Sequence, residues 1–205
     1  MWTQAGQQAI AALRLSPHAA YRRNELQAMY RKFETEIEKL NQRVEEQVSE
    51  RPRARLLMTH PGVGPITALA TEVFLGDPSR FADSKALASY VGMIPGEYSS
   101  GGRQRLGGLT KQGNPLLRFL WSEAVIHAVR RDPQLKQFYR RKLNQKGLGK
   151  ARAAVARKLG IRMWIMLRDR IGYNEFCRRG QMQQISGEAR AGMPVQRLVR
   201  KSPAE

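Results

Sequence analysis

The sequence predicts an all-α protein, with a long helix followed by a compact helical domain. Three observations lead to this fold class. Apolar residues recur at helical spacing in several segments, Gly- and Pro-containing turns separate those segments, and no segment alternates apolar and polar residues as a half-buried strand does. We find no internal repeat.

Residues 18–50 predict one long helix, because no Gly or Pro interrupts them. Their apolar residues follow alternating steps of four and three over three heptads: Leu26, Tyr30, Phe33, Ile37, Leu40 and Val44. Two interpretations stay open. The segment is either a surface helix packed on its own domain, or one strand of an antiparallel or dimeric coiled coil.

A series of shorter helices is expected next. Residues 54–75 predict a helix, a tight turn at 60–65 and a second helix, and a short helix follows at 84–91. Pro115 begins an apolar helix reaching about residue 129, and further helices cover about 134–145 and 150–170. The expected core residues are Leu117, Leu120, Trp121, Ala124 and Ala128, and then Val155, Leu159, Met163 and Met166.

These elements suggest three parts. Residues 1–51 form a helical linker or coiled coil, residues 52–178 form a domain, and residues 179–205 form a weakly apolar tail that we expect to be disordered.

Positive charge is concentrated in one region. The chain has a formal net charge of +19 and a pI near 11.0. Residues 98–160 contain 15 Lys or Arg against 2 Asp or Glu, whereas residues 1–97 contain 12 against 11. Such a positive field attracts a polyanion. We expect the partner to be nucleic acid in the first place, and an anionic membrane surface only in the second.

Composition also excludes several classes. No apolar run approaches the roughly 20 residues of a membrane span, and we expect no membrane partner. The single cysteine, Cys177, cannot form an internal disulfide and fits a reducing cytoplasmic setting. His18, His60 and His127 are not in ligand spacing, so we expect structural histidines and no metal or cofactor bound by this chain.

The turn at residues 60–65 has the spacing of a helix-hairpin-helix. Two glycines leave room for a phosphate to approach the main chain, and Pro65 suits a first helical turn. Free N–H groups at that helix start would bind a DNA phosphate without reading sequence. The residues expected to do so are Gly62, Val63, Gly64, Ile66 and Thr67. The alternative is a simple tight turn.

Residues 98–114 carry two serines on a glycine-rich frame among cations. A serine hydroxyl needs a base, a metal or a strong field to act as a nucleophile, and this segment supplies only the field. Residues expected to hold a phosphate here are Arg103, Arg105, Lys111, Asn114 and Arg118. The alternative is a flexible linker.

The segment from Arg130 to Lys158 is rich in Lys and Arg, and Asp132 is its only acidic residue. Its candidate nucleic-acid contacts are Arg140, Arg141, Lys142, Lys150, Arg152, Arg157 and Lys158. The alternative is a solvated helix face. For Phe138, Tyr139 and Trp164, core positions are favoured over base-stacking ones.

Several blocks together resemble a known family. They are LLMTHPGVGP at 56–65, FADSK at 81–85, LASYVGMIP at 87–95, YSSGG at 98–102, TKQGN at 110–114 with Leu117 and Arg118, and KARAAVARKL at 150–159 followed by Trp164. In this order they are similar to the carboxy-terminal domain of the insertion-sequence "one-ten" transposases, relatives of the Piv and MooV DNA invertases. The resemblance covers roughly residues 20–176.

The resemblance implies a DNA recombinase. Family members pair this domain with an amino-terminal RuvC-like domain that carries Asp/Glu/Asp/Asp ligands for Mg²⁺, and a serine in the Ser-Gly motif attacks the DNA backbone. By that motif the nucleophile is Ser100, with Ser99 as the fallback. Some members use a structured guide RNA and act as homo-oligomers, with residues 18–50 matching the connecting coiled coil.

Two departures from the family pattern qualify this interpretation. The RuvC-like domain is absent, so DNA strand transfer by this chain alone is not expected, and Mg²⁺ is expected only with that domain. His60 stands where an aliphatic residue is commoner. The leading hypothesis is a DNA-binding transposase or site-specific recombinase domain. Its rivals are a non-catalytic nucleic-acid-binding protein, a truncated inactive transposase copy, and an interaction subunit that dimerises through residues 18–50.

Overall fold

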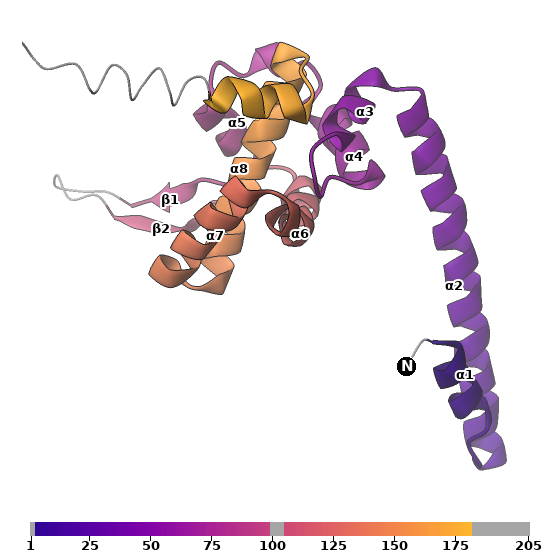
Figure 1. Ribbon diagram of the computed structural model, residues 1–205. Helices are drawn as coiled ribbons and strands as arrows, with labels where there is room; N and C mark the ends of the chain where they lie inside the picture. Colours follow the sequence, from indigo (N-terminus) through magenta and orange to yellow (C-terminus); the bar gives the residue numbers. More distant parts are fainter. Residues whose placement is uncertain (1–2, 99–104, 182–205) are drawn as a thin grey trace, which may run out of the picture. The chain divides into compact units, whose positions relative to one another are not determined.

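The computed structural model describes residues 3–98 and 105–181. They form two compact units, one ending at Glu46 and the other beginning at Gln47. Figure 1 labels the helices and strands in both. The described part is mainly helical, so the all-α fold class is confirmed. No helix among the described residues is both long enough and apolar enough to cross a bilayer.

The first unit consists of α1 (Gln4–Ala11) and most of α2 (Pro17–Ser49). The long helix predicted at 18–50 is therefore confirmed, whereas α1 was missed because its segment shows only a short apolar patch. Arg23 of α2 donates to the carbonyl oxygens of Ile10 and Ala11, at 3.3 and 3.1 Å. A guanidinium at these carbonyls satisfies the free end of α1 and joins the two helices.

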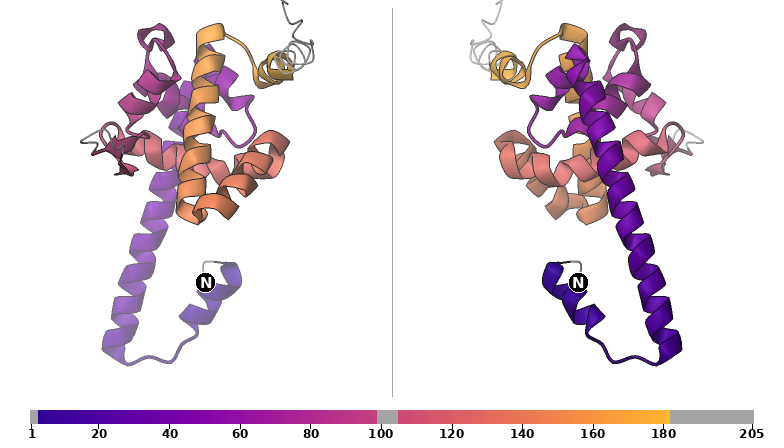
Figure 2. Two further views of the ribbon diagram at one scale, coloured as in Figure 1. Left: turned by 90° about the vertical axis from the view of Figure 1, so that its left-hand side faces the viewer. Right: turned by 90° about the vertical axis from the view of Figure 1, so that its right-hand side faces the viewer.

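The second unit is arranged around α8, which runs through its centre with the other helices against it (Figures 1 and 2). Its elements are α3 (Pro52–Met58), α4 (Pro65–Leu75), the 3₁₀ turn η1 (Pro78–Arg80), α5 (Ser84–Val91), β1 (Pro95–Glu97), β2 (Leu106–Leu109), α6 (Pro115–Arg131), α7 (Pro133–Lys146) and α8 (Leu148–Asp169). Residues 173–181 form a further helix. Residues 179–181, the start of the tail that we expected to be disordered, are therefore helical, and residues 182–205 lie outside the described part.

The predicted core stripes are confirmed. All four expected residues of α8 have fully buried side chains, and on α6 only Leu120 is half-buried rather than buried. The Trp121 indole donates to the Thr71 hydroxyl at 3.0 Å and packs directly against Gly160, where an added Cβ would lie 2.0 Å from the ring. Helical spacing therefore identified the faces that hold α4, α6 and α8 together.

A two-stranded antiparallel hairpin replaces the loop expected at 98–114. β1 pairs with β2 with Pro95 opposite Leu109 and Glu97 opposite Leu106, and the register shifts between them. The strands have three and four residues, and LGGL gives no alternation, so no strand signal exists in the sequence. The serine segment 99–104 joins these two strands.

Two glycines lock the base of this hairpin. Gly92 (φ 73°) and Gly113 (φ 109°) adopt conformations that disfavour side chains. An added Cβ would lie 1.8 Å from the Gln112 carbonyl oxygen at Gly92, and 2.1 Å from the Tyr90 carbonyl oxygen at Gly113. The end of α5 and the start of α6 therefore approach closely, which fixes where the strands leave the core.

A buried ionic cluster joins α7, α8 and the last helix. The Arg162 guanidinium pairs with the Asp132 carboxylate, and both side chains are at most 5% exposed. Asp132 also accepts from the Leu135 N–H at 2.9 Å and from the Tyr173 hydroxyl at 2.8 Å. Burial raises the pKa of Asp132, but these donors outweigh it, so the pKa lies below its ordinary value.

His60 packs beside this cluster, with its ring centroid 4.6 Å from that of Tyr173. Its Nδ1 lies 2.9 Å from the Pro61 carbonyl oxygen, and its Nε2 is buried with no hydrogen-bond partner. Burial lowers the pKa of His60 to about 4. The ring is therefore a neutral structural group at neutral pH, as the sequence predicted for a lone histidine.

Candidate nucleic-acid interface

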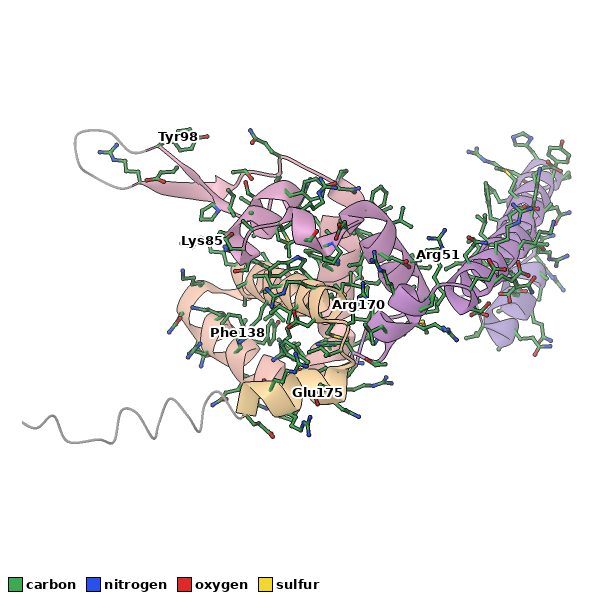
Figure 3. All side chains as sticks on the ribbon, turned by 90° about the horizontal axis from the view of Figure 1, so that it is seen from above. Arg51, Lys85, Tyr98, Phe138, Arg170 and Glu175 are labelled. Atoms are coloured by element: carbon green, nitrogen blue, oxygen red, sulfur yellow. The ribbon has the colours of Figure 1, made fainter. Side chains whose placement is uncertain are left out.

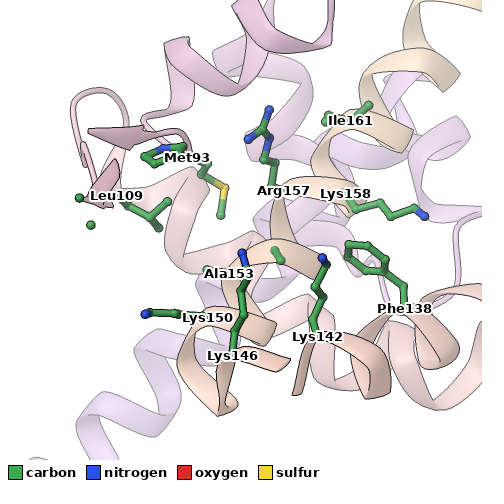
Figure 4. A pocket seen from close by; sticks show the side chains of 14 residues that line it. Met93, Leu109, Phe138, Lys142, Lys146, Lys150, Ala153, Arg157, Lys158 and Ile161 are labelled. Carbon is green, nitrogen blue, oxygen red and sulfur yellow. The ribbon is translucent and has the colours of Figure 1, made fainter. Parts of the chain in front are cut away.

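A hollow of about 530 Å³ lies between the hairpin, α7 and α8. Figure 4 shows Lys142 and Lys146 extending from α7 toward it, with Phe138 and Lys158 at one end and Leu109 at the other. Apolar side chains and hairpin backbone form much of its wall, and five cations surround it. The lining residues are Met93, Pro95, Gly107, Gly108, Leu109, Phe138, Lys142, Lys146, Lys150, Ala153, Ala154, Arg157, Lys158 and Ile161.

Helical periodicity explains why these cations gather. Phe138, Lys142 and Lys146 are four residues apart, which places them on one face of α7. On α8 the lining residues Lys150, Ala154 and Arg157 recur at steps of four and three, which also share one helix face, while the opposite face carries the core stripe. The antiparallel pair α7–α8 therefore turns two basic stripes toward a common hollow.

A second hollow of about 500 Å³ adjoins the first at Phe138 and Lys158. Its other lining residues are Gln134, Gln137, Arg140, Arg141 and Asn144. We call the two hollows together the α7–α8 groove. Among the described residues that line the groove there is no carboxylate, so its cations are not neutralised from within. This is the charge pattern that a phosphate backbone requires.

The Phe138 ring marks the junction of the two hollows. Its centroid lies 4.5 Å from the Lys158 amino nitrogen, 5.5 Å from the Arg141 guanidinium carbon and 5.7 Å from the Lys142 amino nitrogen. Partial burial lowers the pKa of Lys158, and the like charges of Arg162 and Arg141 lower it further. Three cations around one ring therefore favour the arrival of an anion.

Six of the predicted nucleic-acid contacts line this groove. Lys142, Lys150, Arg157 and Lys158 line the first hollow, and Arg140, Arg141 and again Lys158 line the second. Arg152 does not line either hollow. It donates to the Ser122 carbonyl oxygen at 3.0 Å and pairs with the Glu123 carboxylate at 2.5 Å. Positions that looked alike in the sequence therefore have different partners.

Two other predicted contacts hold the hairpin base. The Arg118 guanidinium donates to the carbonyl oxygens of Val91 and Gly113, at 2.9 and 3.0 Å. The Asn114 side-chain oxygen caps α6 by accepting from the N–H groups of Leu116 and Leu117. Both residues have clear structural roles, and their contacts with DNA stay a prediction.

The turn before α4 is partly packed inside the unit. An added Cβ on Gly62 would lie 2.4 Å from the Ala128 backbone nitrogen, and the Val63 and Thr67 side chains are buried. Gly64 and Ile66 are exposed. The tight turn between two helices is therefore present, and phosphate binding at its exposed side stays a prediction.

The serine loop is described only at its ends. Ser99, Ser100 and Arg103 lie outside the described residues, so the predicted nucleophile and that cation are not placed. Arg105 and Lys111 are exposed. Tyr98, labelled in Figure 3, is 79% exposed and its ring lies over Gly107. An exposed aromatic residue therefore stands two residues before the predicted nucleophile, Ser100, in the chain.

The sequence interpretation missed three parts of the groove: Lys146, the Phe138 ring as a wall, and the hairpin stem. The spacing of Phe138, Lys142 and Lys146 was an available signal for the first two. No sequence signal placed the stem against α8. Among the described residues, no group of three or more His, Cys, Asp or Glu side chains could hold a metal ion.

Comparisons with known proteins relate part of this chain to transposases. Residues 54–140 match the family model described as Transposase IS116/IS110/IS902 family. A probable family 20 transposase from Pseudomonas aeruginosa is 33% identical over 106 residues, which cover 52% of this chain and 30% of the relative. The transposase for insertion sequence element IS1111A from Coxiella burnetii is 32% identical over 111 residues, with the same coverage.

A pilin gene-inverting protein from Moraxella lacunata is 37% identical over 107 residues, which cover 51% of this chain and 33% of the relative. The chain therefore spans about a third of the length of these curated relatives. The family match begins within α3 and ends within α7, so it includes the hairpin and part of the groove. These matches support a relation of this chain to the IS116/IS110/IS902 family of transposases.

Proposed function

We propose that the second unit is the DNA-holding part of a transposase or site-specific recombinase. The observation that carries this is the α7–α8 groove, whose cations have no carboxylate among the described lining residues and which adjoins the hairpin that bears the serine segment. The groove holds a phosphate backbone through Lys142, Lys146, Lys150 and Arg157. The names of the relatives support the same class of activity.

In this proposal Ser100 is the nucleophile, and Ser99 is the fallback. The Ser100 oxygen attacks a DNA phosphorus, so that a new oxygen–phosphorus bond forms while the bond from phosphorus to one sugar oxygen breaks. The hydroxyl proton passes to water, and the released sugar oxygen takes a proton from water. Arg105, which is exposed directly after the segment, stabilises the charge that develops on the phosphate. Lys111 is exposed at the base of the hairpin, where we propose that it holds a phosphate of the same DNA strand.

The metal chemistry belongs to a second polypeptide or domain of the RuvC-like type. The described residues of this chain offer no ligand set for Mg²⁺, so we derive no metal-dependent step from them. Such a domain would supply the carboxylate ligands. This chain is then incomplete as a catalyst, and its own contribution is to hold DNA and to present the serine.

Oligomerisation through α2 is part of the same proposal. Leu26, Phe33, Ile37 and Leu40 are 57–60% exposed and lie at coiled-coil spacing. A second copy of the helix would cover them. A structured guide RNA is a further candidate for the basic surface, since its phosphates present the same charge as those of DNA.

Salt-dependent binding tests the DNA-holding role. A labelled 40-base-pair duplex of arbitrary sequence is titrated between ~50 and ~200 mM salt, and the affinity falls steeply if many phosphates are contacted. Lys146→Ala/Lys150→Ala reduces the slope of log K against log salt by about 2. The matched control is Lys85→Ala/Lys136→Ala, because both residues are exposed, and neither lines the groove. Equal losses in both variants would contradict the groove assignment.

The nucleophile has its own experiment. The chain is mixed with a RuvC-like domain of a relative, Mg²⁺ and DNA from the ends of that relative's element, and a covalent protein–DNA adduct is sought. Ser100→Ala abolishes the adduct, whereas Ser99→Ala retains it. An undiminished adduct in Ser100→Ala would remove the nucleophile role.

The second candidate function is a non-catalytic nucleic-acid-binding protein. The groove would bind DNA equally well without chemistry, because phosphate contacts alone give affinity. The adduct experiment separates the two, since this alternative predicts no adduct in any variant together with full salt-dependent binding.

A further inference from the structure

The first hollow of the groove has a feature that duplex binding does not require. A phosphate backbone needs cations on an open surface, but this hollow also has an apolar wall made by Met93, Leu109, Ala153, Ala154 and Ile161. Its volume of about 530 Å³ lies in the range typical of small-ligand sites, ~300 to 1,000 Å³. A flat aromatic group of the size of a nucleobase is therefore accommodated.

We propose that this hollow receives the base of an unpaired DNA nucleotide, while the surrounding cations hold the phosphates on either side of it. The inference rests on the proposed DNA-holding function and names the form of DNA that the site selects. An apolar pocket within a basic rim combines the two interactions that single strands offer, the faces of their bases and their charged backbone.

Phe138 gives this arrangement a stacking surface. The ring is half-buried at the junction of the two hollows, and three cations lie within 5.7 Å of its centroid. A base on this ring would have cationic groups on both sides along the groove: Lys142 and Lys158 at the first hollow, and Arg140 and Arg141 at the second. Base–aromatic stacking contributes to affinity without regard to sequence.

The lining also indicates which sugar is accepted. The side chains of the first hollow's described lining include no hydroxyl, amide or carboxylate that would accept a hydrogen bond from a ribose 2′-hydroxyl. Recognition of RNA commonly uses that hydroxyl. A deoxynucleotide therefore loses no side-chain acceptor of a 2′-hydroxyl in this hollow.

The energetic consequence is a preference for distorted DNA. A base in an intact duplex must leave its stack and its partner before it can enter, whereas a bulged base has no partner and leaves at lower cost. The groove therefore binds a duplex with an unpaired base more tightly than the same duplex without one. This preference is independent of the serine.

Anisotropy titrations of the full chain with four labelled probes test this inference. The probes are a 20-base-pair duplex, the same duplex with one bulged thymine, that bulge as an abasic site, and a single-stranded RNA of the same sequence. Ala153→Phe fills the hollow without changing charge, and Phe138→Leu removes the ring but keeps apolar bulk. The control is Ala86→Phe, an exposed alanine of α5 outside the groove. Thermal unfolding confirms that each variant is folded.

We expect the bulged duplex to bind at least tenfold more tightly than the plain one, and the abasic bulge to lose most of that gain. Ala153→Phe removes the gain, Phe138→Leu reduces it, and Ala86→Phe preserves it. Equal binding of all DNA probes, or a gain that survives Ala153→Phe, overturns the inference and leaves the proposed function intact. Tighter binding of RNA that Ala153→Phe abolishes overturns the assignment to DNA. No binding to any probe overturns the proposed function as well.

Discussion

The two faces of α8 use basic side chains in opposite ways. On the core side, Arg162 is 4% exposed and pairs with the buried Asp132 carboxylate. On the groove side, Lys150, Arg157 and Lys158 line a surface on which the described lining residues include no carboxylate. The same kind of residue thus stabilises the fold on one face and is available for an anion on the other.

This contrast shows that the role of a basic side chain depends on the groups it contacts rather than on its charge alone. A buried charge that loses its partner remains desolvated and is costly, whereas an exposed cation loses little when its neighbours change. The basic region was visible in the sequence as a whole. Only the fold shows which of its cations are structural, such as Arg118 and Arg152, and which line the groove.

The largest effect on stability is expected on the core face. Arg162→Met leaves the Asp132 carboxylate buried without its charged partner, which lowers the free energy of unfolding by roughly 3 to 5 kcal/mol. Arg157→Met, on the groove face, changes it by less than about 0.5 kcal/mol. Urea unfolding of both variants measures the contrast. Similar losses of unfolding free energy in the two variants would contradict the proposed difference between the two faces of α8.

The next largest effect is a pH dependence of the free energy of unfolding that arises from His60. Its pKa falls from 6.5 to about 4 on folding, so the unfolded chain binds more protons between these values and stability decreases as the pH falls through that window. The free energy of unfolding at pH 4.5 is therefore roughly 2 to 3 kcal/mol below its value at pH 7 from this group alone.

His60→Leu should remove most of this dependence, because leucine carries no proton and suits the apolar contacts of the site. His127→Leu, at an exposed histidine, is the control and should keep the dependence. Urea unfolding at several pH values between 4.5 and 7 makes the measurement. An unchanged pH profile in His60→Leu would show that another group titrates.

A smaller effect is expected at Arg152, which is basic but lies outside the groove. Arg152→Ala removes its bonds to the Ser122 carbonyl and to Glu123, both partly exposed, and lowers the free energy of unfolding by about 1 kcal/mol or less. Duplex affinity in filter binding stays within twofold. A loss of affinity as large as that of a groove lysine would extend the interface to this side of α8.

A small gain in stability is expected at Lys158. Lys158 is partly desolvated and repelled by Arg162 and Arg141, so Lys158→Met raises the free energy of unfolding by roughly 0.5 kcal/mol. The same change weakens duplex binding severalfold, because a groove cation is lost. Thermal unfolding measures the gain in stability, and anisotropy with the same preparation measures the loss of duplex affinity. A loss of stability would indicate that the contact of the Lys158 amino group with the Phe138 ring outweighs this repulsion.

Much of the fold could be predicted because its elements are regular. The apolar spacing of α8 identified its core face, and Asp83 and Asn114, which cap α5 and α6, stand where their helices begin. The hairpin could not be predicted, since LGGL lacks alternation and its pairing depends on Gly92 and Gly113 fixing the base. For the same reason no local pattern placed Leu109 in the same hollow as Ala153, although most of the cations around that hollow were identified.

A site-specific crosslink tests the central claim most directly. In a Cys177→Ser background, Lys146→Cys and Lys136→Cys place one thiol-linked photo-crosslinker on either a groove or a non-groove position of the same helix. After illumination with bound duplex, the account predicts a strong DNA crosslink from position 146 and little from position 136. Equal crosslinking, or a stronger product at 136, would show that DNA does not lie in the α7–α8 groove.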